Sequence, residues 1–242
     1  MKKFKMVKVM RQILSLSAMV VMMWVFCLNV HAEEGKTVVA LGADLSAEQR
    51  ATVLGLMGIT EEQLSTYDVV YITNSQEHQY LDSYLGSSVI GSKSLSSVML
   101  KKGAKGSGVN VTTKNINYCT TGMYRNALLT AGIQDTEVIV AAPAPISGTA
   151  ALIGAVKAYE KMEGTAISEA SLSSALDELI TTGQLAEAAE NVSGDEVEAL
   201  IAYIKQKVAN GELETDEDVR AAIAEGSEKF GVFLSEEEIQ KI

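Results

Sequence analysis

The sequence predicts an α/β (or α+β) protein, in which a mixed sheet with flanking helices is followed by an antiparallel helical subdomain. Up to residue 164, short apolar runs rich in Val and Ile alternate with segments that carry helix-capping signals. From residue 165 onward, apolar residues recur with a helical period and acidic residues fill the positions between them. We therefore divide the 242 residues into a segment at 1–32, an α/β domain at 33–164 and an acidic helical subdomain at 165–242.

The expected strands are runs of strand length that are apolar or rich in β-branched residues. They are, in chain order, residues 37–41, 68–73, 94–100, 108–113 and 137–141. Gly103 and Gly106 lie in the short segment 101–107, which predicts a hairpin connection between the third and fourth strands. Pro143 and Pro145 are expected to end the fifth strand, because proline donates no backbone hydrogen bond.

Helices are expected where a capping residue precedes a suitable segment. Ser46 and Gln49 form a capping box before a helix that extends to about Met57 and stops at Gly58. The other expected starts in this half are Thr60 for a short turn, Ser75 for a helix to Leu85, Thr120 or Thr121 for a helix through Leu128, and Ser147 for a helix to Tyr159.

The second half is predicted to be wholly helical, with apolar stripes that bury one face and leave the acids outside. The stripes are Leu172, Ala175, Leu176, Leu179 and Ile180; Val197, Leu200, Ile201, Ile204 and Val208; and Val219, Ala222, Ile223 and Phe230. Capping boxes begin at Ser193 and Ser235, and Asp218 occupies the third helical position after Thr215. No heptad repeat is sustained, so these helices are expected to pack as a small array rather than a coiled coil.

The N-terminal segment is typical of a secretory signal. Five bases precede eighteen almost wholly apolar residues at 13–30; the bases are Lys2, Lys3, Lys5, Lys8 and Arg11. Val30 and Ala32 fit a signal-peptidase site, so we expect cleavage after Ala32. An uncleaved anchor is the alternative, because eighteen apolar residues nearly span a bilayer. The rest of the chain is expected to be secreted or associated with the envelope, with membrane contact only through an uncleaved segment.

The formal net charge of −11 is unevenly distributed along the chain. Residues 1–32 hold five bases and no acid, whereas residues 165–242 hold eighteen acids and five bases. No acid lies between Asp82 and Asp135. This basic segment holds six bases, Lys93, Lys101, Lys102, Lys105, Lys114 and Arg125. We expect it either to attract the acidic subdomain or to meet an anionic envelope polymer or lipid surface.

Two helix starts lack an acid in their first turn and are candidate anion sites. The first candidate is Ser147, Gly148 and Thr149; the second is Thr120, Thr121 and Gly122. Free N–H groups and a partial positive charge make such a start favourable for anions. The first candidate follows a strand, presents two hydroxyls, and has a glycine that lets a ligand approach the backbone. The alternative is that Ser147 is only an N-cap and the small residues allow tight packing.

No catalytic set is evident. A hydrolase would use Ser147 or Cys119 as nucleophile with His78 as base, but no spacing supports this combination. His78 and Cys119 are the only His and Cys outside 1–32, so we expect no metal site and no internal disulfide. No nucleotide fingerprint predicts a cofactor. The basic segment lacks Trp and Phe, so no nucleic-acid partner is expected.

Two tracts carry a resemblance to a known family. Residues 40–50 (ALGADLSAEQR) form the first, and residues 124–160, with the blocks YRNAL, AGI, VAAP, SGTAAL and KAYE, form the second. Together they resemble domain of unknown function 1002, a secreted bacterial family found mainly in Gram-positive bacteria. The resemblance covers most of the chain beyond residue 32. It implies an exported, envelope-associated or extracellular protein, and it brings no accepted activity, cofactor or catalytic residues.

The sequence therefore favours an exported binding or interaction protein over an enzyme. We expect Ser147, Gly148 and Thr149 to hold a phosphate or carboxylate of an envelope component. One alternative is a cell-envelope hydrolase that uses Ser147 or Cys119 with His78. The other is a structural protein that docks on an envelope protein through its helical stripes.

Overall fold

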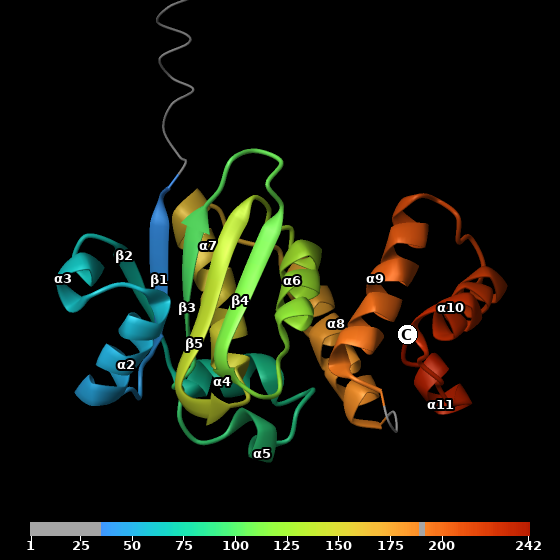
Figure 1. The fold of residues 1–242 in the computed structure, drawn as a ribbon, viewed down its shortest axis with the longest axis horizontal. Coiled ribbons are helices and arrows are strands. Elements are labelled where there is room, and N and C mark those ends of the chain that lie inside the picture. The colour runs from blue at the N-terminus through green and yellow to red at the C-terminus, as the bar shows by residue number, and fades with distance from the viewer. Residues whose placement is uncertain (1–34, 189–191) are drawn as a thin grey trace, which may run out of the picture. The chain divides into compact units, whose positions relative to one another are not determined.

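The structure is a computed structural model that describes residues 35–188 and 192–242; the expected signal segment lies outside them. A mixed five-stranded sheet carries helices on both faces and is followed by a helical C-terminal part (Figure 1). The predicted fold class is therefore confirmed. Among the described residues, no helix is both long enough and apolar enough to cross a membrane.

The sheet has four parallel strands and one that runs against them. Its strands are β1 (Thr37–Gly42), β2 (Asp68–Ile72), β3 (Ser97–Lys102), β4 (Val109–Ile116) and β5 (Thr136–Ile146), in the order β2-β1-β3-β5-β4. β1 pairs with β2 and β4 with β5 in parallel, whereas β3 is antiparallel to both β1 and β5. The carboxyl ends of the four parallel strands therefore meet at one edge, where β3 begins.

The predicted hairpin between β3 and β4 is wrong, because β5 lies between these two strands. β5 is a buried apolar strand and gains a neighbour on each side from this central place. The glycine-rich segment that follows β3 folds around Asp135 instead: the backbone N–H groups of Gly106 and Gly108 donate to Asp135 Oδ1 at 2.9 and 3.1 Å. These two bonds hold the pKa of Asp135 below its ordinary value.

β5 also continues through Pro143 and Pro145 to Ile146, beyond its expected end. Its pairing with β3 stops at Ala141, and β4 is irregular in register opposite the prolines. Proline is tolerated where a strand is paired on one side or irregularly, because no ladder bond needs its missing N–H.

The helices of the first half are amphipathic layers on the sheet. They are α2 (Ala47–Met57), α3 (Glu61–Leu64), α4 (Asn74–Leu81), α5 (Ser87–Ile90), α6 (Thr121–Thr130) and α7 (Thr149–Glu163). Alternate residues of β1 face opposite sides. Val38 and Ala40 belong to the core cluster that includes α7, whereas Val39 and Leu41 pack with residues of α2.

Three helix starts differ from the expectation. Thr73, not Ser75, caps α4, and its hydroxyl accepts from the Gln76 N–H at 3.2 Å. α5 has no side-chain cap and was not predicted. The N-cap of α7 is Gly148 in a left-handed conformation, with φ 96°, rather than Ser147. A side-chain cap is therefore not what starts this helix.

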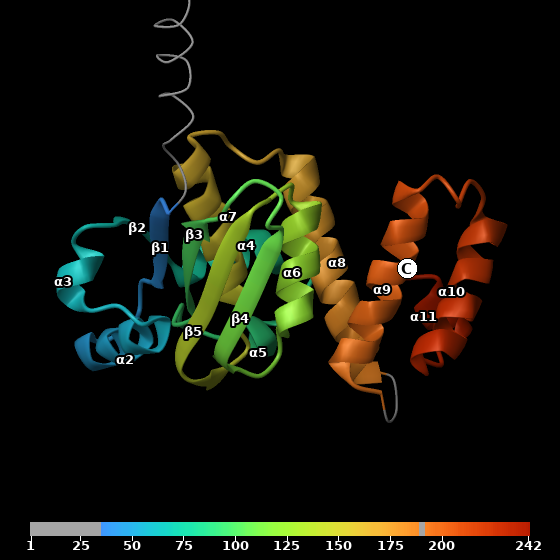
Figure 2. The same ribbon diagram turned by 45° about the horizontal axis from the view of Figure 1, so that its top comes forward.

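The C-terminal helices are α8 (Glu169–Ala188), α9 (Gly194–Ala209), α10 (Asp216–Phe230) and α11 (Glu236–Ile239). They lie on the β4 side of the sheet in both views (Figures 1 and 2). The α8 stripe, from Leu172 to Ile180, shares one core cluster with the sheet, α6 and α7, while α9 and α10 form a separate cluster. The core thus continues across the expected boundary at 164/165, which stays a prediction.

Candidate functional site

A cavity of about 530 Å³ lies at the edge where the parallel strands end. The segments after β2, β4 and β5 and the segment before β3 contribute to its wall: Glu77 of α4, Asn117, Ser147 and Thr149, and residues 88–93, 95 and 96. Ligands of open α/β sheets commonly bind outside the carboxyl ends of strands. The topology therefore places Ser147 and Thr149, two of the three residues of the first candidate site, in the wall of a cavity at the edge where such ligands bind.

Gly148 has a different role from the one its sequence context suggested. A Cβ atom at this position would lie 2.5 Å from Tyr124 Oη and 2.7 Å from Ile116 Cγ2, so the space beside the glycine is filled by protein. The Tyr124 hydroxyl also donates to the Gly148 carbonyl. Gly148 is thus required by its left-handed backbone and by this close packing. Ser147 and Thr149 are the members of the triplet that line the cavity.

The sequence analysis missed Glu77, which is the most unusual group in the cavity wall. Its side chain is 1% exposed, and its Oε1 accepts a hydrogen bond from Thr149 Oγ1 at 2.9 Å. Its Oε2 has no hydrogen-bond partner among the described residues. Burial raises the pKa of Glu77 to about 7, against the opposing effect of Thr149 and of the nearby Asn74 and Ser94. The carboxyl is therefore poised between its neutral and charged forms near neutral pH.

A sequence signal for Glu77 existed. Glu77 precedes the fully buried Leu81 by four residues, and residues four apart lie on the same face of a helix. An acid on the buried face of a helix that follows a strand is rare enough to mark a site. The candidate residues predicted from the sequence included the neighbouring His78 but not Glu77.

The rest of the cavity wall carries one cation and several hydroxyl groups. Lys93 is exposed at the cavity and has no ion-pair partner within 35–188 and 192–242. The Ser147 and Thr149 hydroxyls lie 3.4 Å apart. Ser96 Oγ accepts from the Ala151 N–H at 3.0 Å, which satisfies one free donor of the first turn of α7. Glu77, when charged, only accepts.

The second candidate site, Thr120, Thr121 and Gly122, is covered by another glutamate. Glu198 of α9 lies directly over Gly122, because a Cβ there would be 1.6 Å from Glu198 Oε2. Glu198 is 5% exposed, and its Oε1 has no partner among the described residues. Burial raises its pKa to about 7, opposed by a hydrogen bond from the Met123 backbone and by the charge of Arg125.

The same arrangement thus occurs at both candidate helix starts, those of α6 and α7, neither of which has an acid in its own first turn. A buried glutamate from a different helix lies against each: Glu77 from α4 at the start of α7, and Glu198 from α9 at the start of α6. A carboxylate is favoured there by the partial positive charge of the helix end. An external anion at either start must therefore coexist with the chain's own carboxyl group.

Within residues 35–188 and 192–242, no hydrogen bond joins the side chains of His78, Ser147 and Cys119; the Cys119 backbone N–H donates to the Ser147 carbonyl at 3.0 Å. His78 Nδ1 lies 2.6 Å from Asp82 Oδ1, and its Nε2 lies 3.2 Å from the Gly91 carbonyl oxygen. Cys119 is fully buried, which raises the pKa of its thiol to about 12. Among the described residues His78 is paired with Asp82 but hydrogen-bonds to neither candidate nucleophile, and Cys119 is held as a thiol, so the geometry adds no support for nucleophilic catalysis. The described part of the chain also contains no cluster of three or more metal-ligating His, Cys, Asp or Glu side chains.

The basic segment is neutralised partly within its own half. Lys101 and Lys102 pair with Glu137 and Glu163, both of which precede residue 165. Arg125 instead lines a cavity of about 290 Å³ with Asp195 and Glu198 of α9. The expected attraction between the basic segment and the acidic helices is therefore observed at Arg125.

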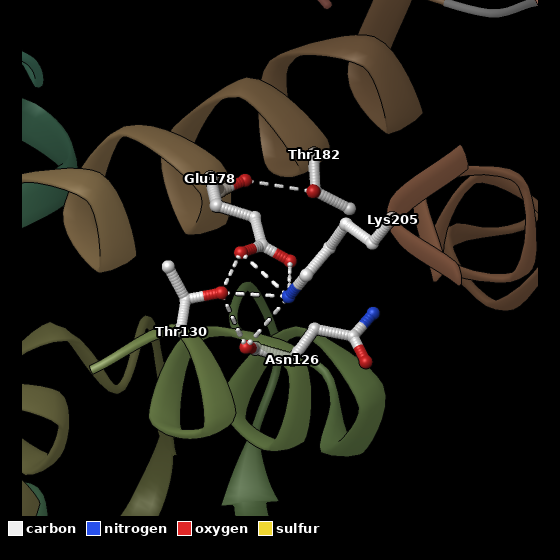
Figure 3. A network of polar contacts seen from close by, with 5 residues as sticks. All are labelled: Asn126, Thr130, Glu178, Thr182 and Lys205. Carbon is white, nitrogen blue, oxygen red and sulfur yellow. Dashed lines mark hydrogen bonds and ion pairs between the residues drawn. The ribbon is translucent and has the colours of Figure 1, made fainter. Parts of the chain in front are cut away.

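A second feature lies where α9 meets α8 and α6. Lys205 Nζ donates to both carboxylate oxygens of Glu178, at 2.8 and 2.9 Å, to Thr130 Oγ1 at 2.6 Å and to the Asn126 carbonyl at 3.2 Å (Figure 3). Thr182 Oγ1 donates to the Glu178 carbonyl, one turn back along α8. The network therefore ties three helices together through one ammonium group.

A groove of about 540 Å³ runs beside this network between α8 and α9, with Ile201, Ile204 and Val208 in its wall. Val208 was expected to be buried in the α9 stripe but is 55% exposed, and Leu129 of α6 is 45% exposed nearby. Phe233, after α10, is 78% exposed. The helical half thus presents several apolar side chains to solvent.

Comparison with known proteins supplies the family. A model described as "Protein of unknown function (DUF1002)" matches residues 41–242, which include the end of β1, the other four strands, the residues that line the cavity and all the C-terminal helices. The chain belongs to the DUF1002 family. It is 39% identical over 206 residues to "Uncharacterized protein YpuA" of Bacillus subtilis (strain 168), an alignment that covers 85% of this chain and 69% of that protein. No solved structure matches. The expected resemblance is confirmed, and no activity comes with it.

Proposed function

We propose that this DUF1002 protein is an exported binding protein that holds the anionic group of a small polar ligand in the cavity at the carboxyl edge of the sheet. The observation that carries the proposal is the cavity itself, which brings Ser147 and Thr149 at the start of α7 together with the unpaired Lys93. A helix N-terminus and a cation favour an anion at the same place.

The cell envelope or extracellular space is the proposed location. Residues 1–32 support export, because five bases are followed by eighteen almost wholly apolar residues and by a sequence that fits a signal-peptidase site. An anionic envelope component is then the proposed partner, because Lys93 and the start of α7 both favour negative charge at the cavity.

Isothermal titration at about pH 6, where Glu77 is mostly protonated, tests the proposal. The protein would be titrated with inorganic phosphate and with teichoic-acid and peptidoglycan fragments. We expect binding of at least one, weakened about tenfold by Lys93→Glu because a charge at the cavity is reversed. Lys105→Glu is the matched control, since the loop after the antiparallel β3 lies at the opposite edge of the sheet. No heat with any ligand, or equal effects of both variants, would contradict the proposal.

A second candidate is a structural protein that docks on an envelope protein through the groove between α8 and α9. The exposed Val208 at this groove favours it. A photo-crosslinking side chain at position 208 should then capture a protein from envelope extracts, whereas one at exposed position 48 of α2 should not. Equal capture at both positions would count against it. No observation favours the hydrolase alternative.

A further inference from the structure

We propose that the groove between α8 and α9 docks an amphipathic helix with a basic flank, contributed by another protein. The inference rests on the second candidate function, docking on an envelope protein, and names the kind of partner segment that this groove fits. It is independent of the anion cavity at the edge of the sheet. Neither the family description nor the relative's name gives a partner.

The two walls of the groove differ in chemistry. The wall from α9 is apolar: Ile201, Ile204 and Val208 recur at intervals of three and four residues, so they lie along one face of the helix. The wall from α8 is polar and has the same period. It consists of Ser174, Asp177, Glu178 and Thr181. A segment that lies between the two helices therefore meets an apolar surface on one side and a polar surface on the other.

The apolar surface continues beyond the groove. Val208 is 55% exposed in the groove wall. A second hollow of about 320 Å³, between α6 and α9, shares Lys205 with the groove and has the 45% exposed Leu129 in its wall. A partner that covers Val208 and Leu129 removes apolar area from water, which is the main favourable contribution when a helix docks in a groove.

The partner segment is expected to be helical because both walls are helices. Backbone groups in the middle of α8 and α9 bond within their own helix, and none of the described residues that line the groove belongs to a strand. An extended peptide would leave its own backbone groups unpaired there, whereas a helix satisfies them internally. The apolar wall from Ile201 to Val208 is about 10 Å long, so a partner helix of about three turns covers it.

The basic flank follows from the charge of this part of the chain. Residues 165–242 hold eighteen acids and five bases. Asp177 is exposed in the groove wall and has no hydrogen-bond or ion-pair partner within 35–188 and 192–242. Its neighbour Glu178 is already bound by Lys205, as Figure 3 shows. Asp177 is therefore the carboxylate that is available to a cation of the partner.

The same charge disfavours other occupants. A second copy of the chain would bring another strongly acidic surface to the groove, and an anionic lipid surface would be repelled in the same way. Lys241 is the one base besides Lys205 among the described residues that line the groove, and it follows α11. The α8 wall therefore stays acidic, and a Lys or Arg on that side of a partner helix meets Asp177.

The experiment measures the binding of two designed helical peptides to the protein by fluorescence anisotropy. Both peptides carry the same stripe of leucines at helical spacing on an alanine background. One has lysines along one flank of the stripe, and the other has glutamates at the same positions. We expect the lysine peptide to bind at least about tenfold more tightly at about 50 mM salt. The difference should shrink at about 500 mM salt, because salt screens exposed charges.

Two pairs of variants locate the site. Val208→Gln should weaken binding of the lysine peptide about fivefold, because it removes exposed apolar surface from the groove. Tyr71→Gln, at an equally exposed residue of β2, should not weaken it. Asp177→Asn should weaken it about threefold. Asp216→Asn removes the same charge from the exposed start of α10 and should have a smaller effect. All four side chains are exposed, so the fold is expected to tolerate each change.

The outcomes separate this inference from the proposed functions. Equal binding of the two peptides, or equal losses from Asp177→Asn and Asp216→Asn, would overturn the basic flank. Binding that Val208→Gln leaves unchanged would overturn the groove as the site. Sedimentation of the protein alone tests the second copy: self-association that Val208→Gln abolishes would give the groove to another copy of the chain. Capture of an envelope protein at position 208, despite equal binding of the peptides, would keep the docking function and overturn this inference. Anion binding is tested separately by the phosphate titration.

Discussion

Burial of the Glu77 carboxyl should make this protein less stable as the pH rises through neutrality. Its pKa is about 7 in the folded chain against 4.5 for an exposed glutamate. Between these values the folded chain holds a proton that the unfolded chain has released, so raising the pH favours unfolding. Integrating over the window from about pH 5 to about pH 8 gives a loss on the order of 2–3 kcal/mol from this one group.

Glu77→Gln isolates this contribution, since the amide is nearly isosteric and does not titrate. Urea unfolding of both proteins at the two pH values gives four free energies of unfolding. We expect the free energy of unfolding of the variant to gain on the order of 2–3 kcal/mol relative to that of the wild type on going from about pH 5 to about pH 8. Glu237→Gln, at an exposed position of α11, is the control and should show no such gain. Parallel pH profiles for wild type and Glu77→Gln would refute the reasoning.

Four further substitutions test a close approach, a polar network and a helix cap by urea unfolding. Gly122→Ala forces a methyl group against Glu198 and should cost at least about 1 kcal/mol, whereas Gly55→Ala, in open space within α2, should stabilise by up to about 1 kcal/mol. If neither substitution changes the free energy of unfolding, Glu198 does not lie directly against Gly122. Lys205→Met removes the ammonium group from the three-helix network and should cost about 2 kcal/mol; no loss would mean that the network is not stabilising. Ser46→Ala removes a capping hydrogen bond and should cost about 1 kcal/mol, and an unchanged midpoint would exclude a role for the cap.

Local signals in the sequence predicted the local structure well. The capping boxes at Ser46, Ser193, Thr215 and Ser235 each begin a helix where expected, because the cap and its partner lie only three residues apart. The apolar runs at the β1 and β2 positions became strands for a similar reason: side-chain alternation and β-branching are properties of adjacent residues.

Features that depend on distant residues could not be read in the same way. The strand order places β5 between β3 and β4, so that β5 pairs on both of its sides. No pattern within residues 101–107 predicts this order. The starts of α7 and α6 have no acid in their own sequence, because the carboxyl group that lies against each comes from a distant segment. Glu77 lies 72 residues before Thr149, and Glu198 lies on a helix beyond the sheet. The candidate residues Ser147 and Thr149 were found from their neighbours, whereas the carboxyl that changes their chemistry was not.

The core that α8 shares with the sheet has a practical consequence for dissecting the molecule. A fragment that ends at Gly164 would keep every strand yet lose the side chains of Leu172, Leu176 and Leu179, which cover α6. The uncovered face of α6 would then be an apolar patch of the kind that drives aggregation. Such a fragment should sediment as large species, while one that extends through α8 should remain monodisperse. Neither half behaves as an exchangeable module, and the sheet with α8 is the smallest part that we expect to be inherited or expressed intact.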